Sequence, residues 1–288
     1  MAIHSQYNYL TKNNAFINKY VIEQCNGILN EKTALSTLIL TITDDCNMYC
    51  KHCPRGNGYV HPDNLPVHMS LETIKVLCEQ LGKDFIGRFS ICGIGEPTLH
   101  PQLKEIILLL NELCPQSYIF MITNGNELKE EIVQMPMLQR IEISVYSKEL
   151  EDLNLERWKN YEKIHIRCQY PGNMTTKFNN RAGNVFEVLE EEVPNTMCYM
   201  PFYQITLDTN GDCYYCSCDW KREDPLGNIY NQNIYDIFTN NFKHTRIKLL
   251  EHKRNELKLC SKCNGRGNIA KVFINFWKDY YKDEIKER

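Results

Sequence analysis

The chain contains 288 residues, 14 of which are cysteine, and it carries a formal net charge of −3 at pH 7. A chain of this length buries a substantial core without disulfides, so the cysteines indicate metal or redox chemistry. Acidic and basic residues are interspersed, which excludes the basic footprint of a nucleic-acid binder, and no apolar run approaches the roughly 20 residues that span a bilayer. The polar segment Met1 to Asn14 lacks the pattern of a secretory signal. We therefore expect a cytoplasmic protein with reduced thiols and with neither a membrane nor a nucleic acid as partner.

Short apolar strands alternate with amphipathic helical patterns between Thr37 and Gln169, which is typical of a parallel sheet built from strand–helix units. We expect helices to begin near Leu71, Pro101, Glu127 and Lys148, the first with Ser70 as its N-cap. The predicted strands are Thr37–Thr43, Arg88–Gly93, Tyr118–Thr123, Arg140–Val145 and Lys163–Gln169.

Polar residues alternate with apolar ones along three of these strands. Thr41 and Thr43 lie on the polar side of the first strand, Glu142 and Ser144 on that of the fourth, and Arg167 on that of the fifth. An ordinary parallel sheet is apolar on both faces, so a polar face predicts an open barrel whose lumen holds a polar ligand. The alternative is that these positions are strand ends that reach solvent.

The pattern changes after Gln169. Residues 170–195 contain turn-forming and acidic residues, and they are expected to form a loop, a possible last strand and a linker. The Asn210-Gly211 pair between two alternating segments then predicts a hairpin over Gln204–Tyr215. Helical patterns near Ile234–Phe242 and from Ile269 onward complete a smaller unit. We expect an N-terminal extension (1–36), an α/β barrel unit (37–193) and a cysteine-rich domain (194–288).

Three cysteines follow the first predicted strand directly, at the spacing Cys46-x3-Cys50-x2-Cys53. Three thiolates on one loop can hold three corners of a 4Fe-4S cluster and leave the fourth iron open to bind a small molecule. A structural zinc site needs four ligands, so the zinc alternative would have to borrow a distant residue such as His61 or His68.

The spacing, its position after the first strand and the ring of His52 before the last cysteine resemble the signature of the radical S-adenosylmethionine (SAM) superfamily. The resemblance implies a partial (β/α)6 barrel in which the open iron chelates SAM. It also implies reductive cleavage of SAM to a 5′-deoxyadenosyl radical that takes a hydrogen atom from substrate, with a flavodoxin- or ferredoxin-type protein as electron donor.

Other segments resemble that family in order along the chain. Cys92-Gly93-Ile94-Gly95-Glu96-Pro97 is similar to the Gly-Gly-Glu-Pro segment that receives the SAM amino group, although Ile94 interrupts the two glycines. Asn124, in Thr123-Asn124-Gly125, and Ser144 resemble positions that contact the methionine and ribose of SAM. Gly93, Gly95, Glu96, Asn124, Ser144 and His52 are therefore the expected cofactor-binding residues.

The last third of the chain holds a second group of cysteines: Cys198, Cys213, Cys216, Cys218, Cys260 and Cys263. Their order resembles the SPASM and twitch extensions of radical SAM enzymes, which bind auxiliary 4Fe-4S clusters. The resemblance implies one auxiliary cluster, with Cys198, Cys216, Cys260 and Cys263 as ligands. Either Cys213 or Cys218 could replace Cys216, and sulfur ligands alone would also suit zinc.

The sequence indicates the cofactors more clearly than it indicates the reaction. Asn180-Arg181-Ala182-Gly183 resembles a segment of aminocyclitol dehydrogenases whose arginine lies near substrate, so oxidation of a small polar or carbohydrate-like alcohol, with the auxiliary cluster as electron acceptor, is the leading hypothesis. Epimerisation, with Cys92, Cys213 or Cys218 returning a hydrogen atom, is an alternative, and so is maturation of a peptide. Arg181 could also be a plain surface arginine. A non-catalytic iron–sulfur or zinc protein would explain the cysteines but not the ordered SAM-type segments.

Overall fold

The computed structural model describes residues 25, 28–50, 52–58, 65–172, 180–185, 197–222, 225–265 and 271–285. An eight-stranded sheet, in the order β5-β4-β3-β2-β1-β6-β7-β8, runs through these residues. Its first five strands pair in parallel with their neighbours. They are β1 (Thr37–Leu40), β2 (Arg88–Ile91), β3 (Tyr118–Thr123), β4 (Leu138–Val145) and β5 (Ile164–Cys168). All five predicted strands are confirmed, with shifts of up to three residues at their ends.

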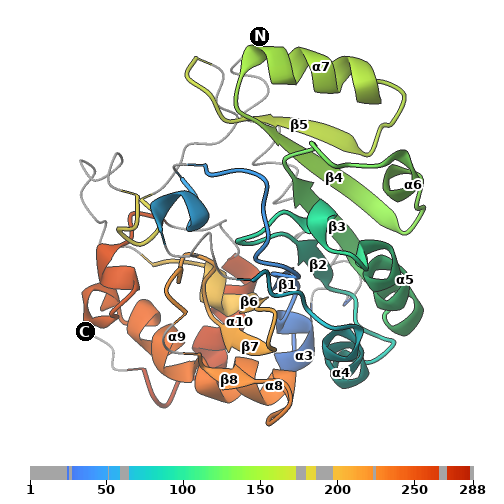
Figure 1. The fold of residues 1–288 in the computed structure, drawn as a ribbon. Coiled ribbons are helices and arrows are strands. Elements are labelled where there is room, and N and C mark those ends of the chain that lie inside the picture. The colour runs from blue at the N-terminus through green and yellow to red at the C-terminus, as the bar shows by residue number, and fades with distance from the viewer. Residues whose placement is uncertain are drawn as a thin grey trace.

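The helices between these strands lie along one side of the sheet (Figure 1). They are α4 (Leu71–Leu81), α5 (Leu103–Leu113), α6 (Glu130–Val133) and α7 (Lys148–Trp158), preceded by the short α3 (Glu31–Ala34). Ser70 Oγ accepts a hydrogen bond of 3.0 Å from the Thr73 N–H, which confirms the predicted N-cap of α4. Ile74 and Leu77 of α4 are fully buried, and burying such a side chain contributes about 1.5–3 kcal/mol. Helical periodicity therefore builds the outer core and leaves the opposite face of the sheet for the site.

The predicted hairpin is confirmed as β6 (Gln204–Leu207) and β7 (Asp212–Tyr214), followed by the short β8 (Gly227–Asn228). β6 also pairs in parallel with β1, with Gln204 opposite Thr37. The sheet is therefore continuous between the barrel and the C-terminal unit, which the sequence had suggested as separate units. Pairing with β6 satisfies the backbone groups that β1 would otherwise expose at an edge. The possible last strand between residues 170 and 195 falls mainly outside the described residues.

The C-terminal unit packs α8 (Ile234–Asp236), a π-helical turn (Ile237–Asn241), α9 (Lys243–Leu250) and α10 (Lys271–Tyr280) around an aromatic cluster. Arg246 of α9 is fully buried there, 3.8 Å from the centroid of the Trp277 ring. Burial lowers the pKa of Arg246 to about 10, and its Nε donates to the Pro201 carbonyl at 2.8 Å. Because α9 buries this arginine, its sequence lacks a clear apolar stripe, and the helix was not predicted.

Short 3-10 turns complete the described fold: η2 (Arg55–Asn57), η3 (Pro97–Leu99), η5 (Met200–Phe202), η7 (Arg254–Glu256) and η8 (Cys260–Lys262). No helix in the described part of the chain is both long and apolar enough to cross a membrane.

Candidate active site

A cavity of about 300 Å³ opens at the carboxyl ends of the parallel strands. Thr41, just beyond β1, Ser144 on β4, Arg167 on β5 and Thr206 on β6 all line it. Thr41, Ser144 and Arg167 of the predicted polar face therefore line a lumen, and for them the alternative that these residues only reach solvent is wrong. Thr43 and Glu142, predicted on the same face, do not line this cavity. Carboxyl ends of parallel strands are where α/β barrels bind their ligands.

The loop after β1 forms one wall of this cavity and presents Cys46, Cys50 and Cys53. The Met48 N–H donates to Cys46 Sγ at 3.4 Å, and Cys53 Sγ lies 3.7 Å from the carbonyl oxygen of Ile94, at the end of β2. Arg55 Nη1 donates to the Asp44 carbonyl at 2.7 Å and so closes the base of the loop. Three thiols of one loop thus face the lumen together.

The structure supplies no nearby fourth ligand for a zinc ion among the described residues. His68, one of the alternative zinc ligands, has its Nδ1 2.8 Å from Thr43 Oγ1, and His61 lies outside the described residues. Among the residues that the structure describes, no three His, Cys, Asp or Glu side chains come close enough together to hold a single metal ion. The ligands of a 4Fe-4S cluster occupy separate corners of a cube, so they are spaced more widely than those of one zinc ion.

Burial controls the protonation of these thiols. Desolvation raises the pKa of Cys46 to about 11, and it also raises the pKa of Cys53. The half-buried Tyr146, which follows β4, forms a hydrogen bond with the Cys50 thiol and lines the same cavity. Without iron these buried thiols stay protonated, and iron must displace the protons to bind.

The carboxylate of Glu96 is fixed at the centre of the site and is 3% exposed. Its Oε1 accepts from the Thr98 N–H at 3.1 Å and from the Thr98 and Thr123 hydroxyls, while its Oε2 accepts from the Asn124 N–H at 2.7 Å. Four donors from the ends of β2 and β3 therefore hold this anion against the lumen. A carboxylate held in this way can receive an ammonium group such as that of SAM.

Two glycines are required by the close packing of this segment. Gly93 has a φ of +141°, and a Cβ there would lie 2.2 Å from Thr41 Oγ1. A Cβ at Gly95 would lie 2.2 Å from the Thr43 carbonyl oxygen. The segment before Glu96 therefore packs directly on the loop that carries the cysteines. Ile94, which departs from the family pattern, is buried and leaves this contact intact.

The remaining predicted cofactor residues also reach the cavity. Asn124 Nδ2 donates to Asn47 Oδ1 in the cysteine loop at 2.7 Å, and the half-buried His52 lines the lumen. Ser144 Oγ and Thr206 Oγ1 are buried in the lining, and neither has a hydrogen-bond partner among the described residues. Buried hydroxyls without partners are costly, so the residues present fit a polar ligand.

A second cavity, of about 60 Å³, lies in the C-terminal unit, and five thiols line it: Cys198, Cys216, Cys218, Cys260 and Cys263. Desolvation raises the pKa of Cys198 to about 11 and that of Cys260 to about 12. Cys213 is fully buried in the hairpin, with its Sγ 3.9 Å from the Gly211 carbonyl, and it lines neither cavity. The structure thus brings together the four predicted ligands and Cys218, and leaves Cys213 apart.

Arg254 organises the loop that carries Cys260 and Cys263. It is 2% exposed, and it donates to the carbonyl groups of Cys260 (3.1 Å), Cys263 (2.6 Å) and Gly265 (2.6 Å). A fixed positive charge beside sulfur ligands favours their thiolate form and influences the reduction potential of a cluster. No sequence pattern indicates this residue, because its acceptors are backbone groups.

A short strap, residues 180–184, lies between the two cavities. Asn180 and Asn264 exchange hydrogen bonds of 2.7 and 3.0 Å, and Asn180 Nδ2 donates to the Lys262 carbonyl at 2.8 Å. Arg181 and Ala182 have φ values of +48° and +57°, which L side chains rarely adopt. Arg181 lines the first cavity and Ala182 the second. The cysteine loop of the second cavity therefore holds Arg181 in place.

Cys92 also faces the first cavity, as the alternation along β2 predicts, with Phe89 and Ile91 buried on the other side. Desolvation raises the pKa of Cys92 to about 11, so its thiol is protonated at neutral pH. Tyr146, which continues the polar side of the fourth strand, lines the cavity as that alternation predicts, whereas sequence reasoning missed Thr206, Ser217, Trp220 and Arg222. These four residues lie in the C-terminal unit, and only tertiary structure brings them to the lumen.

Comparisons with known proteins agree with this geometry. A model described as the radical SAM superfamily matches residues 40–190, which is more than half of the chain. The chain belongs to the radical SAM superfamily. A model of the SPASM iron–sulfur cluster-binding domain matches residues 198–264, which contain the second group of thiols. As a radical SAM enzyme, the protein uses SAM and 4Fe-4S clusters, and thiols of the kind that hold such clusters line its two cavities.

A curated relative and a solved structure are similar over most of this radical SAM chain, and a third relative over a shorter part. The S-adenosyl-L-methionine-dependent 2-deoxy-scyllo-inosamine dehydrogenase of Niallia circulans is 26% identical over 80% of this chain and 92% of its own length. The crystal structure of BtrN in complex with AdoMet and 2-DOIA superimposes with a TM-score of 0.67 and 25% identity, covering 80% of this chain and 93% of BtrN. The GTP 3′,8-cyclase of Aquifex aeolicus is 33% identical, but over only 39% of this chain and 36% of its own length.

Proposed function

We propose that this radical SAM enzyme oxidises a secondary alcohol of a small, carbohydrate-like substrate to a ketone. The observation that supports the proposal is the shared wall of the two cavities. Arg181 and Ser217 line the SAM-type cavity, whereas their chain neighbours Ala182, Cys216 and Cys218 line the cysteine cavity. A substrate held against this wall would lie between the two sites.

The proposed cofactor residues divide into two sets. Cys46, Cys50 and Cys53 would hold the cluster that binds SAM, and Glu96 would receive the SAM ammonium group. Cys198, Cys260 and Cys263 would hold the auxiliary cluster, with Cys216 or Cys218 as the fourth ligand. Bound there, the first cluster and SAM supply abstraction of a hydrogen atom from carbon, with a flavodoxin- or ferredoxin-type protein as the expected source of the electron.

Conversion of an alcohol to a ketone removes one hydrogen atom from carbon, one proton from oxygen, which passes to solvent, and one electron. We assign the binding of the alcohol oxygen to Arg181, whose guanidinium can donate hydrogen bonds as negative charge develops on that oxygen. The electron would cross the wall formed by residues 181–182 and 216–218 to the auxiliary cluster. The hydrogen bonds of Asn180 with Lys262 and Asn264 would hold the wall against the cysteine loop and so keep the distance for electron transfer short. The dehydrogenase relative of Niallia circulans, which covers both parts of the chain, supports this reaction.

The experiment incubates the anaerobically reconstituted enzyme with SAM, a chemical reductant and a panel of cyclitols and sugars that includes 2-deoxy-scyllo-inosamine. Mass spectrometry follows 5′-deoxyadenosine and any product that has lost two hydrogens. We expect both products from wild type, and 5′-deoxyadenosine alone from the Cys260→Ala/Cys263→Ala variant. Ketone formation that survives in this variant would contradict a role for the auxiliary cluster as electron acceptor.

Epimerisation is the second candidate, because the protonated thiol of Cys92 faces the same cavity. A thiol in this state can return a hydrogen atom to a carbon radical, and the product would then be an isomer of the substrate. In deuterated buffer the product would gain one deuterium, and Cys92→Ala would abolish that gain. A product that has lost two hydrogens, formed equally well by Cys92→Ala, would exclude this candidate.

A further inference from the structure

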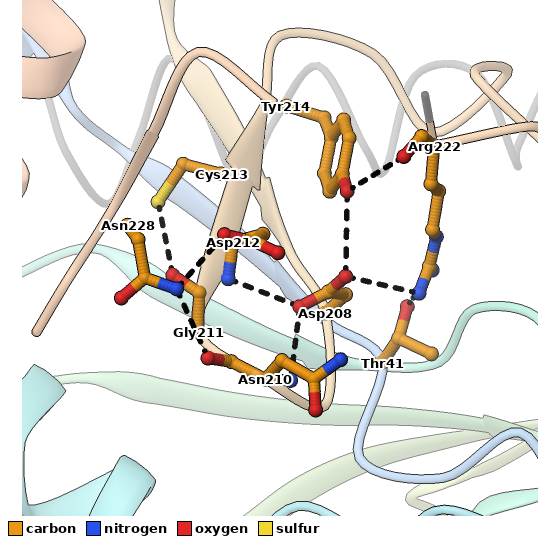
Figure 2. Close-up of polar contacts among 9 residues, drawn as sticks. All are labelled: Thr41, Asp208, Asn210, Gly211, Asp212, Cys213, Tyr214, Arg222 and Asn228. Carbon is orange, nitrogen blue, oxygen red and sulfur yellow. Dashed lines mark hydrogen bonds and ion pairs between the residues drawn. The ribbon is translucent and has the colours of Figure 1, made fainter. Parts of the chain in front are cut away.

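An arginine of the C-terminal unit extends into the substrate cavity from the side opposite the SAM-binding segments of β3 and β4. Arg222 lines that cavity, and its side chain is 18% exposed. Its Nη2 donates to Thr41 Oγ1 at 2.9 Å, and its Nη1 lies 3.8 Å from Asp208 Oδ2 (Figure 2). Arg222 therefore connects the hairpin β6–β7 with the end of β1.

The partner carboxylate is itself fixed by the hairpin turn. Asp208 Oδ1 accepts from the Asn210 N–H at 2.9 Å and from the Asp212 N–H at 3.0 Å. The Tyr214 hydroxyl lies 3.4 Å from Asp208 Oδ2 and 3.3 Å from the Arg222 carbonyl oxygen, so it holds both the carboxylate and the backbone of the arginine (Figure 2). The guanidinium is thus held at a defined position above the lumen.

Stability does not explain this arrangement. Burial raises the pKa of Asp208 and lowers that of Arg222, so desolvation of both charges outweighs their mutual attraction. Arg222 also has a φ of +50°, a left-handed conformation that is unfavourable for a residue with a side chain. Strained backbone and a costly buried charge at the edge of a ligand cavity are typical of a functional position.

The charges that line the cavity are unbalanced. Among the described residues that line it, the charged side chains besides the thiols are Arg167, Arg181 and Arg222 and the carboxylate of Glu96, while Asp208 lies 3.8 Å from Arg222 outside the lining. The carboxylate of SAM can neutralise one guanidinium, and the others then face the substrate. In the lining of the same cavity, Thr206 is 3% exposed, and its hydroxyl has no hydrogen-bond partner within the part of the chain that the structure describes. A group that can bind an anion therefore lines the same cavity as a hydroxyl that still requires a partner.

We propose that Arg222 binds a carboxylate or phosphate group of the substrate, which is therefore a hydroxylated small molecule with an anionic substituent, such as a sugar acid or a sugar phosphate. The proposal rests on the proposed function, because it assigns the substrate class of the same site. It separates this chain from the inosamine dehydrogenase relative, since the amino group of an inosamine would be repelled by the guanidinium.

The test measures binding of matched probes to the reconstituted, SAM-loaded enzyme by anaerobic calorimetry. The pairs are myo-inositol with myo-inositol 1-phosphate and glucose with glucuronate, and 2-deoxy-scyllo-inosamine is the cationic probe. We expect at least one anionic probe to bind about tenfold or more tightly than its neutral partner, as for a hydrogen bond between charged groups. Arg222→Gln should remove this preference, and Arg222→Lys should keep part of it. The exposed neighbour Lys221 lies outside the cavity lining, so Lys221→Gln should behave as wild type.

If Arg222 were merely structural, Arg222→Gln would weaken the binding of neutral and anionic probes by the same factor. That result would overturn the proposal. The proposal would also be overturned if Arg222→Gln weakened the binding of SAM alone, or if only acidic peptides bound to the enzyme. Measuring SAM cleavage with the same wild-type preparation distinguishes the assignment of Arg222 from the proposed function. An enzyme that cleaves SAM but lacks the anion preference refutes the assignment of Arg222 alone, whereas one that never cleaves SAM refutes the proposed function.

Discussion

Replacing Glu96 with glutamine tests how the site recognises SAM without requiring the substrate to be known. Glutamine keeps the size of the side chain but removes the charge that would face the SAM ammonium group. A hydrogen bond to a charged partner contributes about 1.5–3 kcal/mol, so we expect the affinity for SAM to fall roughly tenfold to a hundredfold. The amide group also cannot accept from all four donors that surround Glu96, which should lower the free energy of unfolding by about 1–3 kcal/mol.

The assay is anaerobic calorimetry of SAM binding, together with the rate of 5′-deoxyadenosine formation without substrate. Glu142→Gln is a matched control, because Glu142 is equally buried and pairs with Arg140 at 2.9 Å but does not line the cavity. The control should lose stability while its SAM affinity stays at the wild-type value. Equal SAM affinity in Glu96→Gln and wild type would refute the assignment of the carboxylate to the ammonium group.

Three further outcomes follow from the two cavities. The raised pKa values of Cys46 and Cys198, each about 11, mean that the thiolate fraction grows about tenfold per pH unit below that value. Cluster assembly, followed by its visible absorbance, should therefore be faster at pH 9 than at pH 7, and a rate independent of pH would contradict this account. Arg254→Met leaves three carbonyl groups without their donor, so it should lower the free energy of unfolding by about 3 kcal/mol or more and remove about four irons. Lys159→Met, at an exposed ion pair with Glu156, should change stability by less than about 1 kcal/mol. Asn180→Ala should release the strap, so that SAM is still cleaved but ketone formation falls about tenfold or more; an unchanged ratio of the two products would exclude a positioning role for Asn180.

Features encoded locally could be predicted from the sequence. The strand over Tyr118–Thr123 and the N-cap at Ser70 depend on periodicity and capping within a few residues. The position of Cys46, Cys50 and Cys53 at the mouth of the barrel follows from their place directly after a strand. The polar side of the strands also indicated a lumen, because a parallel sheet otherwise has no reason to keep polar side chains on one face.

Features that depend on distant parts of the chain could not be predicted. The pairing of Thr37 with Gln204 joins strands far apart in sequence, and no local pattern reveals that the hairpin continues the barrel sheet. Arg222 and Arg254 act through backbone or long-range partners, so neither belongs to a recognisable motif. The choice between Cys216 and Cys218 as a ligand stays open for the same reason, because both lie on one turn and line the same cavity.

The central claim is that two separate groups of thiols hold two 4Fe-4S clusters on either side of the substrate. It is tested most directly by the iron, sulfide and zinc content of anaerobically reconstituted protein. Wild type, the Cys46→Ala/Cys50→Ala/Cys53→Ala variant and the Cys198→Ala/Cys260→Ala/Cys263→Ala variant are compared. The account predicts about eight irons in wild type and about four in each variant. About four irons in wild type that fall to none in the first variant, with zinc retained, would contradict it and make the second group of thiols a structural zinc site.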